Sequence, residues 1–195
     1  IDDHTGEIAL CILSAVNVGK IRSDSELEDL CDLAVRGLEE LIDYQDYPVL
    51  AAELATKARR SLGVGFIGLA HYLAKLGFNY GSQEAWDAVH GLAESFQYYL
   101  LKASNEVAKE KGWCENFGRT KYSDGILPID TYKKDVDEIS SQELQHDWES
   151  LRASILEHGL RHSTLSAQMP SESSCLLYTS PSPRDVEESR MPSSA

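Results

Sequence analysis

IALCILSAVNVG, at residues 8–19, is a short apolar run that ends at a glycine, and an amphipathic segment follows it from Ser23. Such a run is typical of a strand buried on both faces of a sheet. From Ser23 onward apolar side chains recur at steps of three and four, and Ser23 with Glu26 forms a capping box, so a helix is predicted there. A buried strand followed by an amphipathic helix favours the α/β class.

The rest of the chain alternates helical patterns with short apolar runs. Residues 62–72 predict a short strand or tight turn that leads into a helix ending near Gly77, and residues 160–169 are compatible with another strand. Residues 113–135 are expected to be irregular. Three further helices are predicted. Pro48 opens one that runs to about Arg60, and a long one lies between Ser82 and Gly112. The third runs from Gln142 to His158, with Leu144 and Trp148 facing inward and Gly159 as its left-handed terminator.

The composition is that of a globular protein with an acidic surface. Of 195 residues, 42% are apolar and 26% are charged, which excludes a wholly disordered, collagen-like or coiled-coil chain. The 32 acidic and 18 basic side chains leave a formal charge of −14, so no nucleic acid partner is expected. Any phosphate group has to be recognised locally.

Neither a membrane span nor a signal peptide is expected, because no run of eighteen apolar residues is present and the N-terminus is polar. Four widely spaced cysteines do not suit a secreted disulfide scaffold or a paired-cysteine zinc site, so a cytoplasmic location is expected. The start without Met suggests that the chain was cut from something longer. Residues 175–195 are rich in Ser and Pro and are predicted to be disordered.

Two motifs have a ligand interpretation and a plainer one. Residues 63–68, GVGFIG, match GxGxxG, but they lack the strand before and the acidic residue after that a dinucleotide site needs, so close packing is favoured. Asp3, His4 and Glu7 are possible metal ligands in a polar, terminal setting, and Gly159 separates His158 from His162. Solvated loop residues are the favoured interpretation of these histidines, and no metal site is predicted.

Cys11 and the segment after residue 169 are the candidate reactive and binding positions. Cys11 lies inside the first predicted strand, where a thiol can point into a closed site, although a small buried hydrophobe is favoured on the residues alone. Cys31 falls on the apolar face of its helix and is expected in the core, and Cys114 gives no indication of a role. PSESS, at residues 170–174, forms an anion site if a helix starts there, or else a plain cap or loop.

Several stretches resemble the large catalytic chain of class I ribonucleotide reductase. The most specific are WESL at 148–151 and GLRHSTLSAQMP at 159–170, where His162 stands in place of a more usual Asn. The resemblance covers nearly all of residues 6–174. Its other blocks are GEIALC at 6–11, DYQDYP at 43–48, QYYLLKASNE at 97–106 and GILPIDTY at 125–132.

The resemblance implies a helix-rich part of a ten-stranded α/β barrel, in which ribonucleoside diphosphates lose their 2′-hydroxyl through thiyl radical chemistry. It implies that Cys11 is one thiol of the redox-active pair, whose partner is missing here. It also implies that Pro170, Ser171, Glu172, Ser173 and Ser174 hold the diphosphate of the substrate. Residues 1–174 are thus expected to be a partial catalytic barrel domain, inactive alone, and residues 175–195 a foreign tail from a sequencing or assembly artefact.

The family's other components are expected outside this chain. No cofactor is expected in residues 1–174. In the family that the chain resembles, a metal-containing small subunit supplies the radical, and ATP and deoxynucleotides are the effectors. Thioredoxin or glutaredoxin reduces the disulfide of the large subunit. Its large subunit forms a homodimer. Two rival hypotheses are an acidic helical interaction module without catalysis and a nicotinamide-dependent enzyme that uses the glycines at 63–68.

Overall fold

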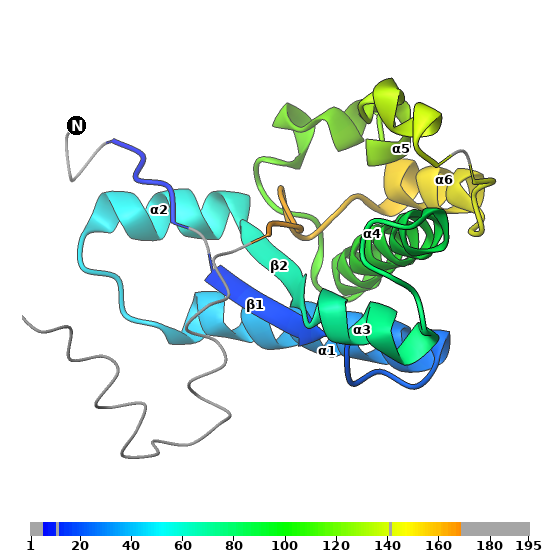
Figure 1. Cartoon of the computed structure of the whole chain (residues 1–195). Coiled ribbons are helices and arrows are strands. Elements are labelled where there is room, and N and C mark those ends of the chain that lie inside the picture. The colour runs from blue at the N-terminus through cyan, green and yellow to red at the C-terminus, as the bar shows by residue number, and fades with distance from the viewer. Residues whose placement is uncertain (1–5, 11, 141, 169–195) are drawn as a thin grey trace, which may run out of the picture.

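The computed structural model describes residues 6–10, 12–140 and 142–168. Strands β1 (Ile12–Asn17) and β2 (Leu62–Ile67) form a parallel pair in which Ile12 lies opposite Leu62 and Asn17 opposite Ile67. Helices α1 (Asp24–Tyr44) and α2 (Leu50–Arg59) connect the two strands, as a parallel crossover requires. The α/β class predicted from the sequence is confirmed (Figure 1).

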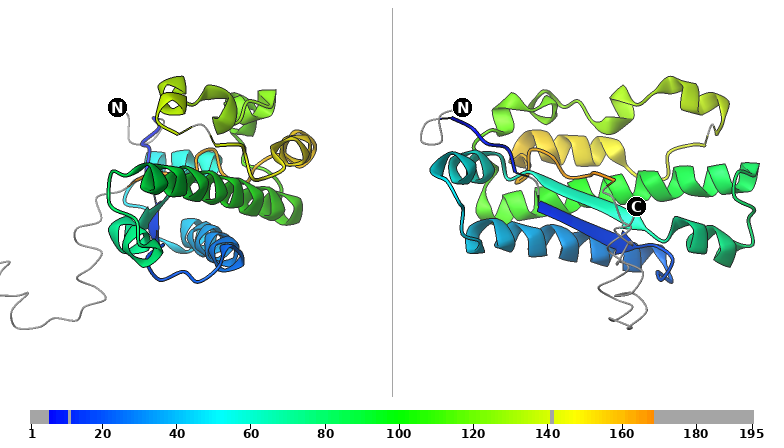
Figure 2. Two further views of the ribbon diagram at one scale, coloured as in Figure 1. Left: turned by 45° about the vertical axis from the view of Figure 1, so that its right-hand side comes forward. Right: turned by 60° about the vertical axis from the view of Figure 1, so that its left-hand side comes forward.

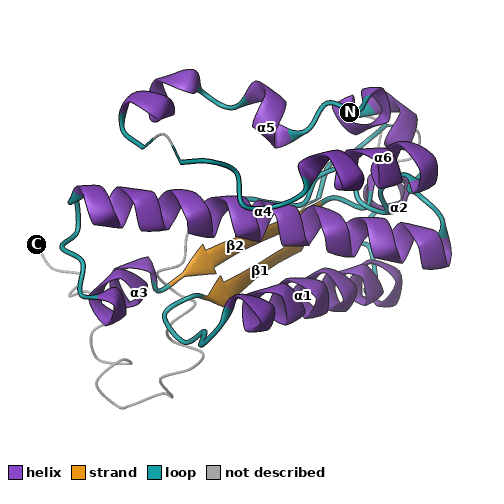
Figure 3. Cartoon of the chain, turned by 90° about the vertical axis from the view of Figure 1, so that its right-hand side faces the viewer, coloured by secondary structure: helices purple, strands orange, loops and turns teal. Residues whose placement is uncertain are grey.

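The remaining elements follow β2. Helix α3 (Leu69–Leu76) starts directly after it, and the long helix α4 (Gln83–Lys111) lies beside α1 on one side of the two strands (Figures 2 and 3). In its described residues, the connection from residue 112 to residue 147 contains three short 3-10 turns and the four-residue helix α5 (Pro128–Thr131). Helix α6 (Trp148–His158) follows it. No helix in the described ranges is long and apolar enough to cross a membrane.

Residues 164–167 run along the second edge of β2. The N–H groups of Leu62 and Val64 donate to the carbonyls of Thr164 and Leu165 at 3.0 and 2.8 Å, and Val64 forms a parallel bridge with Ser166. The predicted strand at 160–169 is therefore present only as this short extended stretch. It makes β2 the central strand of the described sheet.

Strand β1 is less buried than predicted. Leu13 is 50% exposed, because β2 is the only strand that pairs with β1 in the described part of the chain and helices α1 and α4 lie on one side of the sheet. The prediction of a strand buried on both faces is wrong for these residues.

The helix starts at Ser23 and Ser82 are confirmed. The Ser23 hydroxyl accepts from the N–H of Glu26, and the Ser82 hydroxyl accepts from the N–H of Ala85. The Glu26 carboxylate accepts from the N–H of Arg22 at 2.7 Å rather than from that of Ser23, so the capping box is shifted by one residue. Cys31 is fully buried on the inner face of α1, as expected.

Two other helix starts are corrected. Helix α2 begins at Leu50 with Val49 as its N-cap, so Pro48 precedes the helix instead of opening it. Helix α6 begins at Trp148 because the Asp147 side chain caps it, accepting from the N–H of Ser150 at 3.0 Å. Leu144 was predicted to face inward from this helix, but it lies outside the helix and is 52% exposed.

Candidate functional site

The two predicted site segments, Cys11 and Pro170–Ser174, lie outside the described residues. Their described neighbours both lie along β2. Ile12 pairs with Leu62 at the start of β2. The amide side chain of Gln168 accepts from the N–H of Phe66 at 3.0 Å and donates to the carbonyl of Phe66 at 3.4 Å, near the end of that strand. Along β2, the residues that these two neighbours contact are four positions apart, about 13 Å.

The glycines at 63–68 lie in and after the central strand. Gly68 ends β2 and caps α3 with a φ of +77°, and a Cβ there would lie 2.6 Å from the Asn17 side-chain oxygen. Glu84 and Asp87 lie in the first turns of α4, whereas a dinucleotide fold places the ribose-binding carboxylate at the end of a strand. The geometry therefore favours the packing interpretation of this motif.

A buried ionic cluster joins α1 to the segment that leads toward residue 168. Its centre is Glu39, which is 1% exposed. One Glu39 oxygen accepts from Arg161 Nε at 2.7 Å, and the other accepts from Arg60 Nε at 2.7 Å and from His162 Nε2 at 3.0 Å. Burial by itself raises the pKa of Glu39, but the hydrogen bonds from His162, Arg60 and Arg161 outweigh it and hold that pKa far below its usual range.

His162 is fully buried in this cluster, which corrects the interpretation of the histidines as solvated loop residues. Burial lowers the pKa of His162 against the raising effect of Glu39, so the ring is neutral at pH 7. With the proton on Nε2, the ring donates to Glu39 and Nδ1 accepts from the Ser104 hydroxyl at 2.9 Å. The Ser104 oxygen in turn accepts from the N–H of His162 at 3.2 Å.

Sequence reasoning missed Glu39 as a partner of this histidine and Arg60 as a partner of Glu39. Glu39 is four residues after Val35 and three before Ile42, so it lies on the buried face of α1. A charged residue on an apolar helical face was the available indication, since such a residue is rarely buried without a partner. Nothing in the sequence identified Arg60, which has a left-handed backbone with φ of 48° just after α2.

Side chains in or next to the blocks that carry the family resemblance hold neighbouring segments together. Trp148 Nε1 donates to the carboxylate of Glu94 at 3.0 Å. Arg152, four residues later, forms an ion pair with Asp130 of the 125–132 block at 2.7 Å. Arg161 donates to the carbonyl of Gly112 at the end of α4 at 3.1 Å, where the helix dipole favours a cation. In the described residues, these contacts therefore hold α6 and the start of the 159–168 segment against α4 and the 125–132 block.

The two described cysteines have no reactive character. Burial raises the pKa of Cys31 to about 12, and burial also raises the pKa of Cys114, against the lowering effect of Arg161. Both thiols are buried. A buried, protonated thiol is a poor nucleophile and a poor redox group.

The family model and the relatives that match this chain all belong to one family. Residues 2–184 match the family model described as ribonucleotide reductase, barrel domain. The chain is 60% identical over 174 residues to the ribonucleoside-diphosphate reductase subunit alpha of Haemophilus influenzae, which covers 89% of this chain and 23% of that protein. It is 58% identical over 133 residues to ribonucleoside-diphosphate reductase 1 subunit alpha of Escherichia coli, covering 68% of this chain and 18% of the relative. The corresponding phage T4 subunit is 44% identical over 177 residues, covering 89% and 23%. The chain therefore spans less than a quarter of these curated relatives.

Proposed function

Because the chain belongs to the ribonucleotide reductase family, in the barrel domain, we propose that it is a segment of an alpha subunit that reduces ribonucleoside diphosphates to deoxyribonucleoside diphosphates. The observation that carries this proposal is the continuous similarity to alpha subunits over most of the chain. The α/β architecture with parallel strands supports it.

In this proposal Cys11 is one of two thiols that supply the electrons. A thiyl radical on a cysteine elsewhere in the subunit removes the 3′ hydrogen of the ribose and later returns it. The two reducing thiols give up two electrons and two protons as they form a disulfide. The 2′ C–O bond breaks and its oxygen leaves as water with one of these protons, while the two electrons and the other proton form the new C–H bond at C2′. In the sequence, Cys11 directly precedes β1, which pairs with the central strand β2.

The segment Pro170–Ser174 is proposed to bind the diphosphate. An acidic chain needs local donors for a phosphate, and backbone N–H groups with three serine hydroxyls provide them without Lys or Arg. The hydrogen bonds between Gln168 and Phe66 support this assignment, because they fix the chain two residues before Pro170.

Further components of the proposed activity lie outside this segment. The radical is supplied by a metal-containing small subunit, thioredoxin or glutaredoxin reduces the disulfide, and ATP and deoxynucleotides act as effectors on a homodimer of large subunits. The segment itself holds no cofactor in this proposal, and the protein works in the cytoplasm.

Replacing Cys11 with Ser in the complete alpha subunit tests the proposal. We expect multiple turnover with thioredoxin to be lost, because a serine forms no disulfide, while the dissociation constant for a ribonucleoside diphosphate stays within about twofold. Turnover is measured as deoxynucleotide formed per subunit, and substrate binding by equilibrium dialysis.

Cys114→Ser is the matched control, since it changes a buried thiol that has no role in the proposed reaction. Its turnover is expected to equal that of the unmodified subunit. Undiminished steady-state turnover in the Cys11→Ser subunit would contradict the proposed role of this thiol.

A further inference from the structure

The backbone ladder on the second edge of β2 ends before the strand does. In the described residues its last rung is the hydrogen bond from the N–H of Ala167 to the carbonyl of Val64, at 3.1 Å. A parallel ladder that kept this register would next pair the N–H of Phe66 with the carbonyl of Ala167. The N–H of Phe66 instead donates to the side-chain oxygen Oε1 of Gln168 at 3.0 Å. A side chain therefore takes the place of the next backbone rung.

The side-chain amide of Gln168 has the same donor and acceptor as the peptide group that it replaces. Its oxygen accepts from the N–H of Phe66, and its NH2 group donates to the carbonyl of Phe66 at 3.4 Å, the longer and weaker of the two contacts. Both polar backbone groups of Phe66 on this edge are therefore paired. The main chain can thus leave the sheet after Ala167 while it is still tethered to β2.

The two ends of this tether differ in how firmly they are held. Phe66 lies in the central strand, and its ring packs edge-to-face against Phe96 of α4, with 5.4 Å between the ring centroids. Gln168 is exposed, so packing contributes little to its position. The amide contact with Phe66 is therefore what fixes Gln168.

Gln168 is the last fixed point that the structure describes before the proposed diphosphate segment. Residues 170–174 themselves lie outside the described residues. Ser171 follows Gln168 by three residues, which allows at most about 11 Å between their Cα atoms. A segment that is tethered close to its start has fewer conformations to lose when it binds a ligand.

We propose that Gln168 is a positioning residue for the diphosphate of the substrate. This inference rests on the proposed function of residues 170–174. The side-chain amide fixes the start of that segment at β2 and so reduces the conformational freedom that the segment loses on binding the diphosphate. Gln168 acts through the backbone and takes no part in the bond changes at the ribose. Its removal therefore weakens substrate binding and leaves the chemical step intact.

Gln168→Met in the complete alpha subunit tests the inference. Methionine has a similar length and flexibility but no amide, so both contacts with Phe66 are lost. We expect the KM for a ribonucleoside diphosphate to rise about three- to tenfold, with kcat within about twofold of the original. Hydrogen exchange followed by mass spectrometry should show faster exchange in β2, because the N–H of Phe66 loses its acceptor. An unchanged KM overturns the proposal, and so does a loss of kcat without a rise in KM.

Ser171→Ala combined with Ser173→Ala separates this inference from the proposed function. If residues 170–174 bind the diphosphate, the serine variant has a raised KM. Gln168→Met added to it should then raise KM by a smaller factor than it does alone, because the two changes act through one segment. An equal factor in both backgrounds overturns the positioning role. A raised KM in the serine variant with an unchanged KM in Gln168→Met overturns the positioning role alone, whereas an unchanged KM in the serine variant overturns the proposed diphosphate segment as well.

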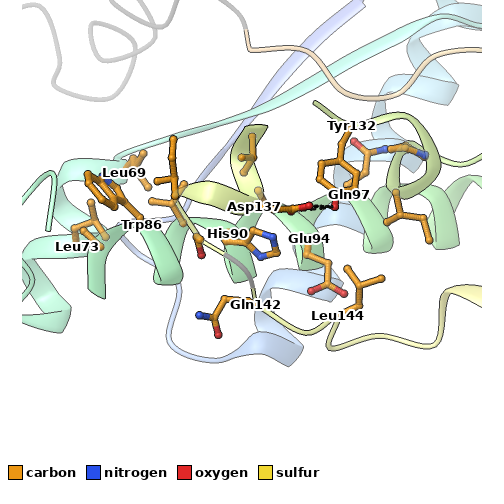
Figure 4. A pocket seen from close by; sticks show the side chains of 18 of the residues that line it. Leu69, Leu73, Trp86, His90, Glu94, Gln97, Tyr132, Asp137, Gln142 and Leu144 are labelled. Carbon is orange, nitrogen blue, oxygen red and sulfur yellow. Dashed lines mark hydrogen bonds between the residues drawn. The ribbon is translucent and has the colours of Figure 1, made fainter. Parts of the chain in front are cut away.

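Gln142→Met is the matched control, since it makes the same change at another exposed glutamine. Gln142 lines a cavity beside α4, and the described lining of this cavity includes no residue of β2 (Figure 4). Its KM and kcat should equal those of the unmodified subunit. A rise in KM equal to that of Gln168→Met would show that the effect does not depend on the contact with Phe66, and would overturn the proposal.

Discussion

His162 illustrates how a single side chain acquires its chemistry from residues far away in the sequence. Its partners are Ser104 on α4 and Glu39 on α1, and Glu39 also binds Arg60 and Arg161. The guanidinium groups keep Glu39 ionised, while burial keeps the imidazole neutral. The family resemblance identified this position as one that usually holds Asn, and a neutral imidazole can donate and accept as an amide does.

The lowered pKa of His162 predicts a pH-dependent stability. The unfolded chain takes up a proton near the ordinary value of 6.5, and the buried ring resists it. The neutral His162 ring therefore contributes fully to the free energy of unfolding above pH 6.5, and this contribution is lost as the pH falls. The lowered pKa of Glu39 acts in the same direction, but only below its ordinary value of 4.5, so it does not contribute between pH 7.5 and 5.5. In the complete subunit, the fall in the urea midpoint between these two pH values should be smaller for His162→Asn.

His158→Asn is the control for this experiment, because His158 is exposed at the end of α6. It should keep the original difference between the two midpoints. An unchanged difference in the His162→Asn subunit would refute the assignment of a neutral, buried imidazole.

At the scale of the elements, the glycine that ends α6 sets the direction of the 159–168 segment that follows it. Gly159 ends α6 with a φ of +73° and a ψ of −168°, so its φ is positive as predicted for a left-handed terminator, but its ψ lies outside the left-handed helical region. A Cβ on Gly159 would lie 2.8 Å from the Cβ of Trp113. The close contact and the positive φ both require glycine at this position.

Gly159→Ala is therefore expected to destabilise the end of α6 locally. The backbone conformation alone costs an alanine about 1–3 kcal/mol, because this combination of φ and ψ is essentially restricted to glycine, and the contact with Trp113 adds to this. Amide hydrogen exchange of the complete subunit, followed by mass spectrometry, should show faster exchange in peptides that cover α6.

Gly37→Ala is the matched control. Gly37 lies inside α1, and a Cβ there meets nothing within 4 Å. The alanine should stabilise α1 by about 0.5–1 kcal/mol and slow its exchange. If Gly159→Ala left the exchange of α6 unchanged, the role of this glycine in ending the helix would be refuted.

At the scale of the molecule, the described sheet is incomplete. Strand β1 pairs on one edge only, residues 164–167 add one short stretch on the other side of β2, and Leu13 is half exposed. Unpaired strand edges and exposed apolar side chains favour association between chains. The rest of a barrel would pair these edges and cover this surface.

Residues 1–174 alone are therefore expected to unfold without a sharp transition and to aggregate. Thermal unfolding followed by circular dichroism, together with light scattering, measures both properties. The complete alpha subunit is the comparison and should remain dispersed below its transition. A sharp, cooperative and reversible transition of residues 1–174 at low scattering would contradict this expectation.

The sequence by itself determined the family and the two longest helices. Helices α1 and α4 follow from apolar periodicity and the serine caps, because capping and amphipathicity depend on residues within a few positions. The ordered motif at 148–170 identified the family, and the comparisons confirmed it. The roles of Cys11 and of Pro170–Ser174 remain predictions, since these residues are outside the described part.

Tertiary structure alone decided which side chains meet. Arg60, His162 and Glu39 are far apart in the sequence, and only the packing of α1 against the end of α2 and the 160–164 segment makes them one cluster. The same holds for the exposure of Leu13, which depends on what covers it. Burial and long-range pairing are properties of the assembled chain, and a local sequence pattern contains no information on the neighbour that supplies them.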